Sequence, residues 1–481
     1  MVLEEGISTD LRETLNQRGS DNESQSGDLV LGDTEGHVGD TVTIRGLQLP
    51  SNAELAVVWK TVVGNWGVIQ ANEIKGPQYQ PKEVTLTDVK TDDSGTFEET
   101  IEIPEDYGST HPIAIRNNGS TVANAEFEIF PHFELLNDNA ELGEFFTVKG
   151  YGIGPNPARN NFQVSWDLGL VGIMTGVKNN GTATASVRAV GPPGKHDILV
   201  WRGYKGVPFL QSRTQSDFGP VGSETQNEWE VTVTEPETEP AAAWSDELIP
   251  EEPLSVHYPS IDRDTEATLT IAPNSGPPGT EAMISGKRFP ENKSVNLVWH
   301  RHDGKRINGK TITPKPQPDK LPTVETDDDG TFEKEVEIPP DRGATRPIVA
   351  EVSGESVAVT GFIMQPKITE FSPTSGPQDT EIDIKISGTG WTLYENANFV
   401  VYDNKMLGYF CGNCDNGEDG IVHLNLPVSG GPGYHFIDIY PTLFETEKDG
   451  HGFECKPHLS YLDNHPIRPL PAHHFAFKIT E

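Results

Sequence analysis

Residues 89–113 read VKTDDSGTFEETIEIPEDYGSTHPI, and nearly the same sequence returns at residues 324–348 as VETDDDGTFEKEVEIPPDRGATRPI. The two stretches align at a constant offset of 235 residues, and 16 of their 25 positions are identical. In each, a turn signal, DDSG in the first copy and DDDG in the second, precedes a run in which apolar and polar residues alternate. Such alternation buries one set of side chains and leaves the other in water, which is typical of a half-exposed β-strand.

The repeat extends beyond this core in both directions. Upstream, at an offset of 240, four positions of the first half match Gly279, Gly286, Pro290 and Trp299, namely Gly39, Gly46, Pro50 and Trp59. Downstream, a weaker repeat pairs Gly150 and Gly152 with Gly388 and Gly390, Asp167 with Asp403, and His196 with His435. The chain is therefore a duplicated unit of two domains.

Short alternating runs and turn signals every 8–12 residues favour antiparallel β-sandwiches. We therefore expect an all-β protein of four tandem immunoglobulin-like sandwich domains. The expected segments are a disordered acidic tail at 1–27, domain A at 28–131, domain B at 132–235, an acidic, Pro-rich linker at 236–266, domain A′ at 267–367 and domain B′ at 368–481. Trp59 and Trp299 lie in apolar strands at matched positions, so we expect both to be core residues.

The start of B′, TEFSPTSGPQDTEIDIKISGTGW at residues 369–391, resembles the opening of an IPT/TIG domain, an immunoglobulin-like module. A second copy begins at residues 271–280 as IAPNSGPPGT. In A and B the resemblance is weaker, because the Ser-Gly-Pro motif is missing there. The resemblance implies an immunoglobulin-like fold and extended arrays, and it brings no catalytic residues.

Charge and composition exclude several classes of function. The 481 residues contain 73 Asp and Glu against 36 Lys and Arg, a net charge of −37, which repels the phosphates of nucleic acid. No apolar stretch of 18 residues is present, so we expect no membrane insertion. The N-terminus has no leader pattern. We expect an extracellular or cell-surface location, with a cytoplasmic or particle-associated one left open.

No catalytic signature of the common hydrolase, metalloprotease or nucleotide-binding classes is present in the sequence. We therefore expect a non-enzymatic structural or adhesive protein of a cell surface, extracellular filament or matrix. The alternatives are a component of a virus-like particle and an accessory region of a carbohydrate-active system. Expected partners are proteins or glycans, with self-association through edge strands among them.

The three cysteines all lie in B′. Cys411 and Cys414 form a C-x-x-C pair, and Cys455 follows His451 by four residues in a long segment at 445–471 that the other domains lack. A disulfide from Cys455 to Cys411 or Cys414 would anchor this segment. The same three cysteines with His451 would also suit tetrahedral zinc. We favour the disulfide; free thiols are the third alternative.

Two further patterns have a metal-binding interpretation and a plain one. The acidic turns at 91–95 and 326–330 suggest calcium, but they fail the EF-hand spacing and match ordinary hairpin turns, which we favour. The pairs His300/His302 and His473/His474 suggest metal ligands, although polar strand residues are commoner. His196 and His435 each follow a Gly-Pro turn, which indicates a shared structural hydrogen bond.

Overall fold

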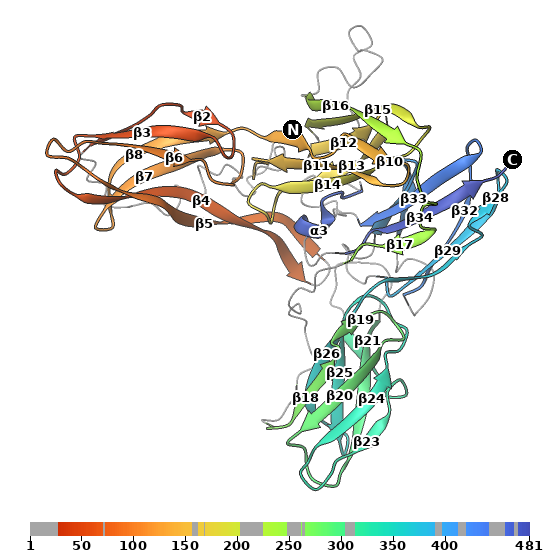
Figure 1. The fold of residues 1–481 in the computed structure, drawn as a ribbon. Coiled ribbons are helices and arrows are strands. Elements are labelled where there is room, and N and C mark those ends of the chain that lie inside the picture. Colours follow the sequence, from red (N-terminus) through yellow and green to blue (C-terminus); the bar gives the residue numbers. More distant parts are fainter. Residues whose placement is uncertain are drawn as a thin grey trace, which may run out of the picture. The chain divides into compact units, whose positions relative to one another are not determined.

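The computed structural model describes residues 27–70, 73–155, 162–167, 169–202, 225–247, 261, 265–303, 313–389, 397–411, 420–441, 457–465 and 470–481. These residues form two compact units (Figure 1). The first contains Met1–Gly67, Lys75–Glu237 and Glu447–Pro466, and the second contains Val68–Ile74, Thr238–Thr446 and Ile467–Glu481. A short segment from the C-terminal part of the sequence thus belongs to the first unit.

The first unit contains two pairs of sheets. Residues 28–129 form a three-stranded sheet, β1 (Asp28–Leu31), β3 (Thr41–Leu47) and β6 (Phe97–Glu102), and a five-stranded sheet in the order β2 (Glu35–Gly36), β8 (Ser120–Ile129), β7 (Thr110–Asn117), β4 (Glu54–Gln70) and β5 (Glu73–Lys90). Residues 132–234 form the sheet β14 (Ala183–Arg188), β11 (Phe145–Tyr151), β9 (His132–Leu135) and the sheet β10 (Asn139–Glu141), β16 (Thr225–Thr234), β15 (Gly194–Arg202), β12 (Phe162–Trp166), β13 (Gly169–Met174).

The second unit repeats this plan. Residues 268–364 form a three-stranded sheet in the order β18 (Thr268–Ala272), β20 (Glu281–Lys287), β24 (Phe332–Glu337). The opposite sheet has the order β19 (Ser275–Gly276), β26 (Glu355–Met364), β25 (Ala344–Val352), β21 (Ser294–Asp303), β22 (Thr313–Gln317), and β23 (Thr323–Glu325) also pairs with β21. Residues 367–479 form a three-stranded sheet in the order β27 (Lys367–Ser372), β29 (Glu381–Ser387), β32 (Val422–Pro427). The opposite sheet has the order β34 (His473–Ile479), β33 (Gly433–Pro441), β30 (Ala397–Tyr402), β31 (Lys405–Cys411), and β28 (Ser375–Gly376) and β17 (Ala243–Ser245) both pair with β34.

One topological detail is common to all four sheet pairs. A short early strand leaves the three-stranded sheet and pairs in parallel with the last strand of the opposite sheet: β2 with β8, β10 with β16, β19 with β26, and β28 with β34. Two antiparallel sheets connected in this way form an immunoglobulin-like sandwich. The predicted all-β, immunoglobulin-like fold class is confirmed, while the boundaries given for domains A, B, A′ and B′ stay predictions.

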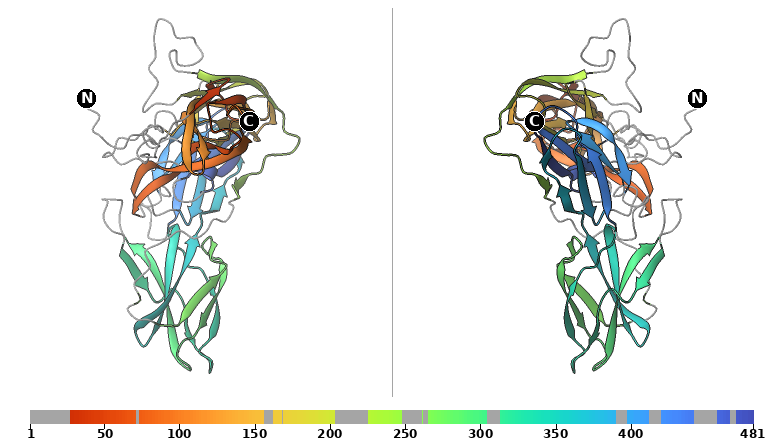
Figure 2. Two further views of the ribbon diagram at one scale, coloured as in Figure 1. Left: turned by 90° about the vertical axis from the view of Figure 1, so that its left-hand side faces the viewer. Right: turned by 90° about the vertical axis from the view of Figure 1, so that its right-hand side faces the viewer.

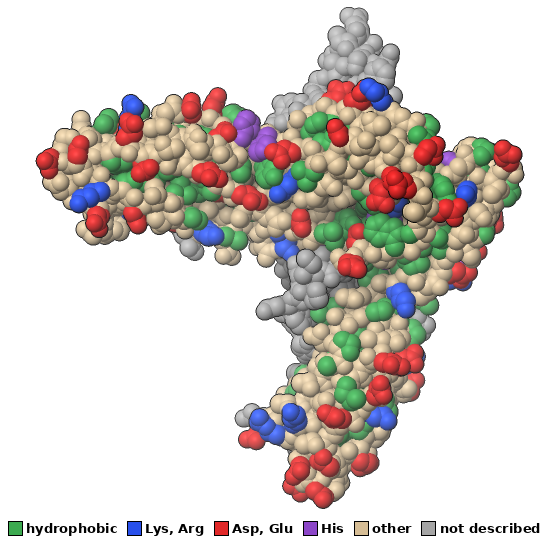
Figure 3. Space-filling model, viewed as in Figure 1, with side chains coloured by type: hydrophobic (Ala, Val, Ile, Leu, Met, Phe, Trp, Pro, Cys, Tyr) green, Lys and Arg blue, Asp and Glu red, His purple; other side chains and the backbone are tan. Residues whose placement is uncertain are grey.

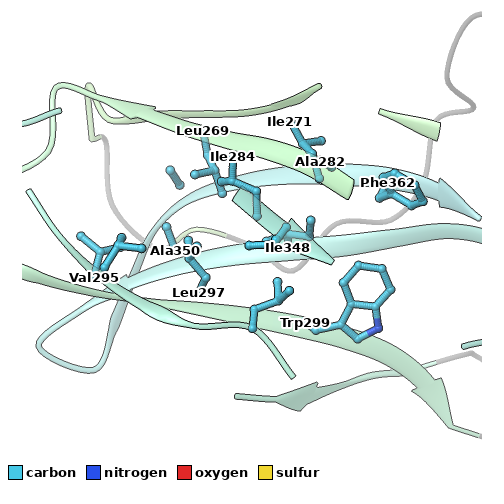
Figure 4. Packing of buried hydrophobic residues seen from close by; sticks show 14 of the residues in the cluster. Leu269, Ile271, Ala282, Ile284, Val295, Leu297, Trp299, Ile348, Ala350 and Phe362 are labelled. Carbon is cyan, nitrogen blue, oxygen red and sulfur yellow. The ribbon is translucent and has the colours of Figure 1, made fainter. Parts of the chain in front are cut away.

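Each sandwich encloses an apolar core between its two sheets. In residues 268–364 the sheets lie face to face as separate layers (Figure 2), and the core side chains point into the space between them (Figure 4). Trp299 is 1% exposed there, and Trp59 is fully buried in the matching cluster of the first unit. The prediction that both tryptophans are core residues is confirmed.

The structure differs from the sequence-based expectation in three places. The strands β4 and β5 have 17 and 18 residues rather than the short runs expected. Part of the predicted linker, Ala243–Ser245, is a strand that pairs with β34, so this part is not a spacer. A four-residue helix, α3 (Tyr461–Asn464), lies in the segment that joins the first unit. Except for Gly27, the predicted tail at 1–27 lies outside the described residues.

Charge is distributed widely over the surface. Asp and Glu side chains are scattered over the face seen in Figure 3, with fewer Lys and Arg among them. None of the helices in the described ranges has the length and apolar character needed to span a membrane.

Candidate functional site: a covered sheet edge and two buried joints

The edge strand β13 is covered by a segment that lies almost 300 residues later in the sequence. Residue Ile173 forms a parallel β-bridge with His458. The Ile173 N–H donates to the Pro457 carbonyl over 2.8 Å, and the Leu459 N–H donates to the Ile173 carbonyl over 2.7 Å. Leu459 packs over Gly172, where an added Cβ would lie 2.8 Å from the leucine Cγ. The segment therefore acts as an additional strand on this sheet.

Polar side chains fix the same segment beyond the bridge. The hydroxyl of Ser460 accepts the Thr175 N–H over 2.9 Å and lies 3.1 Å from the Thr175 carbonyl, to which it donates. The Asn464 side chain accepts the Lys178 N–H over 2.8 Å. The Asn464 carbonyl accepts the indole N–H of Trp66 over 2.7 Å. Because most of these bonds are buried, the segment is held by a specific set of partners and not by apolar contact alone.

His458 is the buried titratable group of this segment. Its Nε2 lies 3.1 Å from the Thr175 hydroxyl and 3.2 Å from that of Ser460. Its Nδ1 has no hydrogen-bond partner among the described residues. Burial lowers the pKa of His458 to about 3, because a charged imidazolium loses its hydration there. The ring is therefore neutral near pH 7.

The predicted cysteine site lies mostly outside the described residues. Cys411 ends β31 without a described side chain, and Cys414, His451 and Cys455 are not among the described residues. The choice between a disulfide and zinc therefore stays a prediction. Within the described ranges, no group of three or more His, Cys, Asp or Glu side chains is arranged to hold a metal ion. The sequence pointed to the segment at 445–471 but gave no sign that β13 is the partner of residues 457–459.

A buried carboxylate organises the joint between the two sandwiches of the first unit. The Asp106 carboxylate accepts the Trp59 indole N–H and the Thr61 hydroxyl, both over 2.7 Å, and His111 Nδ1 lies 3.6 Å away. The adjacent Tyr107 hydroxyl donates to the Val177 carbonyl in the next sandwich over 2.8 Å. The core tryptophan of the first sandwich is thus connected, through two successive residues, to the second sandwich.

The Tyr107 hydroxyl also accepts the Gly64 N–H over 3.0 Å. Burial raises the pKa of this phenol, so the hydroxyl stays protonated and keeps its donor role. The contact is close: a Cβ on Gly108 would collide with the Gly152 carbonyl of the following sandwich. The joint therefore needs glycine at this position, because the backbones of the two sandwiches are in close contact there.

The second unit has an equivalent joint. The Asp341 carboxylate accepts the Trp299 indole N–H over 2.8 Å and the Arg342 N–H over 2.7 Å, and Arg346 Nε lies 3.6 Å away. The Arg346 guanidinium donates to the Arg342 carbonyl over 2.8 Å. The next residue along, Gly343, donates its N–H to the Thr389 carbonyl of the following sandwich over 2.7 Å. Both units thus connect a core Trp–Asp pair to the neighbouring sandwich.

These two aspartates were within reach of sequence reasoning but were not singled out. Each occupies the same position of the long repeat, in EDYG and in PDRG, two residues after the Pro of the EIP motif, and the Asp is identical in the two copies. Identity at an acidic position just beyond a strand is the signal that marked them. A carboxylate placed there can receive the indole N–H that a buried tryptophan needs to satisfy.

The predicted structural role of His196 and His435 is confirmed. His196 Nδ1 lies 3.0 Å from the Asp167 carboxylate, and its Nε2 lies 2.9 Å from the Pro192 carbonyl. His435 makes the same pair of contacts, with Asp403 at 2.6 Å and the Gly431 carbonyl at 2.8 Å. In the second case the Asp403 hydrogen bond raises the pKa of His435.

The acidic segments are tight turns, but the prediction that they are hairpins is wrong, because each joins strands of opposite sheets, β5 to β6 and β23 to β24. The Asp92 carboxylate accepts the N–H groups of Ser94 and Thr96, both over 2.9 Å, and bonds their hydroxyls as well. Asp327 accepts the Asp329 and Thr331 N–H groups in the same manner. The bond from the Ser94 hydroxyl, followed by those from Thr96, lowers the pKa of Asp92 to about 2. Each of these carboxylates is thus bonded by the local donors of its own turn.

The side chains of His473 and His474 do not converge on a common point. The His473 ring bonds the Ser245 hydroxyl at 2.8 Å, whereas His474 Nδ1 bonds the Asp438 carboxylate at 2.7 Å. Neighbouring residues of a strand point to opposite faces, which explains the separate partners. Burial, and then His474, lowers the pKa of His473 to about 3. Burial also lowers the pKa of His300, and the side chain of His302 is outside the described set.

No protein-family model matches the sequence, and no curated protein matches it either. Among solved structures, the chain is similar to an alpha-2-macroglobulin from Salmonella reacted with methylamine, at 7% identity and a TM-score of 0.18, covering 95% of this chain and 31% of that one. An elastase-activated Escherichia coli alpha-2-macroglobulin is 11% identical with a TM-score of 0.17, and the match covers 86% of this chain and 42% of that one. The D1–D4 ectodomain fragment of ICAM-5 is 11% identical with a TM-score of 0.16, and the match covers 87% of this chain and 95% of that one. The chain thus spans less than half the length of the two macroglobulins, and likenesses of this degree transfer no activity to it.

Proposed function

We propose that this protein is a non-enzymatic structural or adhesive array of immunoglobulin-like sandwiches, acting at a cell surface or in an extracellular filament or matrix. Its role is to hold binding surfaces at fixed spacings, with protein or glycan partners engaged through exposed strands and loops. We also propose that the two sandwiches of the second unit are of the IPT/TIG type. The Ser-Gly-Pro motifs there supply the short strands β19 and β28, and each is followed by a Thr hydroxyl bonded to the Pro277 or Pro377 carbonyl.

The observation that carries the proposal is the joint that both units share. In each, a buried Asp bonds the core Trp of one sandwich, and the residue or two that follow bond the backbone of the next. A flexible linker would let neighbouring domains sample many orientations. Buried hydrogen bonds and a glycine without spare space favour one orientation, which suits a protein that sets distances.

The proposal is tested by small-angle X-ray scattering of the full chain with a matched pair of variants. Tyr107→Phe removes a hydroxyl that makes two bonds at the joint. Tyr402→Phe removes a hydroxyl that makes two bonds to Ser429 within one sandwich. We expect the distance distribution to broaden for Tyr107→Phe and to stay at the wild-type width for Tyr402→Phe.

Two results would contradict the proposal. One is a wild-type distribution as broad as that of the Tyr107→Phe variant, since the joint would then set no distance. The other is turnover of a polysaccharide or peptide substrate by the purified chain, with a rate that follows the amount of protein.

A further inference from the structure

In each of the four sandwiches the larger sheet ends in an edge strand at the equivalent position, namely β5, β13, β22 and β31. Three of these four edges are protected. The edges β5 and β22 each contain two prolines, Pro77 and Pro81 or Pro314 and Pro316. Proline lacks the N–H that an incoming strand would bind, so it blocks pairing at an edge. The edge β13 has no proline, and residues 457–459 cover it. Only β31 remains to be accounted for.

The strand β31 has neither kind of protection in the part of the chain that the structure describes. Its sequence, KMLGYFC, contains no proline. A Cβ on Gly172 of β13 would collide with the Pro457 carbonyl and Leu459, but a Cβ on the equivalent Gly408 of β31 would meet nothing within 4 Å. Among the described residues, the position that holds a covering strand in one sandwich is thus open in its duplicate.

Burial of the flanking side chains shows the same difference. Both edges carry a bulge one residue before the glycine, at Val171 and at Leu407. Val171 is fully buried, whereas Leu407 is 58% exposed. On the other side of the glycine, Ile173 is fully buried and Tyr409 is 48% exposed. Apolar residues at matched positions are therefore covered in one edge and exposed to solvent in the other.

The charge of this edge points to its partner. The chain carries a net charge of −37, so two copies repel each other over most of their surface. The strand β31 and its neighbour β30 contain no acidic residue, and Lys405 is their one charged side chain. The same strand of a second copy is an extended, apolar, carboxylate-free segment, and antiparallel pairing about a two-fold axis makes it complementary to itself.

We infer that β31 is a self-association edge, on which β31 of a second copy adds in antiparallel fashion and covers Leu407 and Tyr409. The inference rests on the proposed structural function and names the surface through which copies of the array would join. Strand addition at the equivalent β13 edge shows how such an edge accepts a further strand in this fold.

Sedimentation velocity of the full chain over about 1–200 µM tests this, in 150 and 500 mM NaCl. We expect the wild type to reach twice the monomer mass, at lower concentration in high salt because salt screens the acidic repulsion. Leu407→Lys places a charge on the edge and should weaken dimerisation at least tenfold. The matched control is Leu136→Lys, because Leu136 is 57% exposed but lies on no equivalent edge, and it should dimerise as the wild type does.

Amide hydrogen exchange across Lys405–Cys411 provides the second readout. Exchange there should slow with rising concentration in the wild type and the control, and stay fast in Leu407→Lys. If Leu407→Lys does not fold, Met406→Lys takes its place, since Met406 is 38% exposed on the same strand.

A wild type that stays monomeric to 200 µM in both salts would overturn the inference. A dimer that survives Leu407→Lys would also overturn it. If such a dimer dissociated in Leu459→Lys, the dimer would instead form by exchange of residues 457–465 between two copies. The scattering test separates the two proposals. A monomer with stiff joints overturns only the dimer, and a dimer with loose joints overturns only the proposed function.

Discussion

The two copies of the buried Trp–Asp joint differ in the basic side chain beside the carboxylate. In the first unit His111 Nδ1 lies 3.6 Å from Asp106, and in the second Arg346 Nε lies 3.6 Å from Asp341. The guanidinium carries a permanent positive charge, and the first copy has an imidazole in its place. Duplication has therefore kept the carboxylate and the indole, and has varied the partner that decides what removal of the carboxylate costs.

The largest expected effect is one that both copies should share. Truncating Trp59 or Trp299 to Ala removes a fully packed side chain and leaves its Asp without the indole donor. Each substitution should lower the free energy of unfolding of its own sandwich by about 3–5 kcal/mol. Chemical denaturation followed by fluorescence measures the loss. A change below about 1 kcal/mol for one tryptophan alone would show that the two cores are not equivalent.

The second prediction separates the copies. Asp341→Asn removes the negative charge that lies 3.6 Å from the buried Arg346 guanidinium, which should cost about 3–5 kcal/mol. Asp106→Asn weakens the hydrogen bonds from Trp59 and Thr61 and leaves no guanidinium beside it, so we expect a smaller loss of about 1–3 kcal/mol. Denaturation of the two variants side by side gives the difference. Equal losses would mean that His111 and Arg346 play the same electrostatic part.

The third prediction concerns the covered edge in comparison with the open one. Asn464→Ala removes the bond to the Lys178 N–H, which should cost about 1–3 kcal/mol. Hydrogen exchange should accelerate at residues 457–465 and along β13, and should not change along β31. Unchanged protection of β13 would show that the segment does not depend on its polar anchors.

The smallest expected effect is the pH dependence of the Asp403–His435 bond. Because Asp403 raises the pKa of His435 above its unfolded value, this bond stabilises the fold fully below about pH 6.5. The stabilisation is lost as the pH rises through the folded pKa. The difference in unfolding free energy between wild type and His435→Gln should be below about 1 kcal/mol at pH 5 and smaller at pH 9. A difference that grows with pH would contradict the assigned sign.

The sequence predicted the features that repeat and missed those that depend on one particular neighbour. Alternation and matched positions were sufficient for the all-β class, the core tryptophans and the structural hydrogen bonds of His196 and His435, because the same local pattern is present in two copies. The Asp partners of these histidines were not predicted. The cover on β13 had no such signal, since PHLSYLDN at residues 457–464 has no counterpart in the repeat and its partner Thr175 lies 285 residues before Ser460. The length of β4 and β5 was also hidden, because the sequence between Thr61 and Gln70 gives no periodic signal.

The covering segment has a consequence for synthesis on the ribosome. The strand β13 is complete once residue 174 has been made, but the residues that cover it end at 465. At about 5–20 residues per second, roughly 15–60 s separate the two events. Throughout that interval the nascent chain presents a proline-free edge with Gly172 uncovered, which other unfinished chains on the same messenger can pair with. Slow translation of the second half would therefore raise the yield of aggregated chains even though the finished protein is stable.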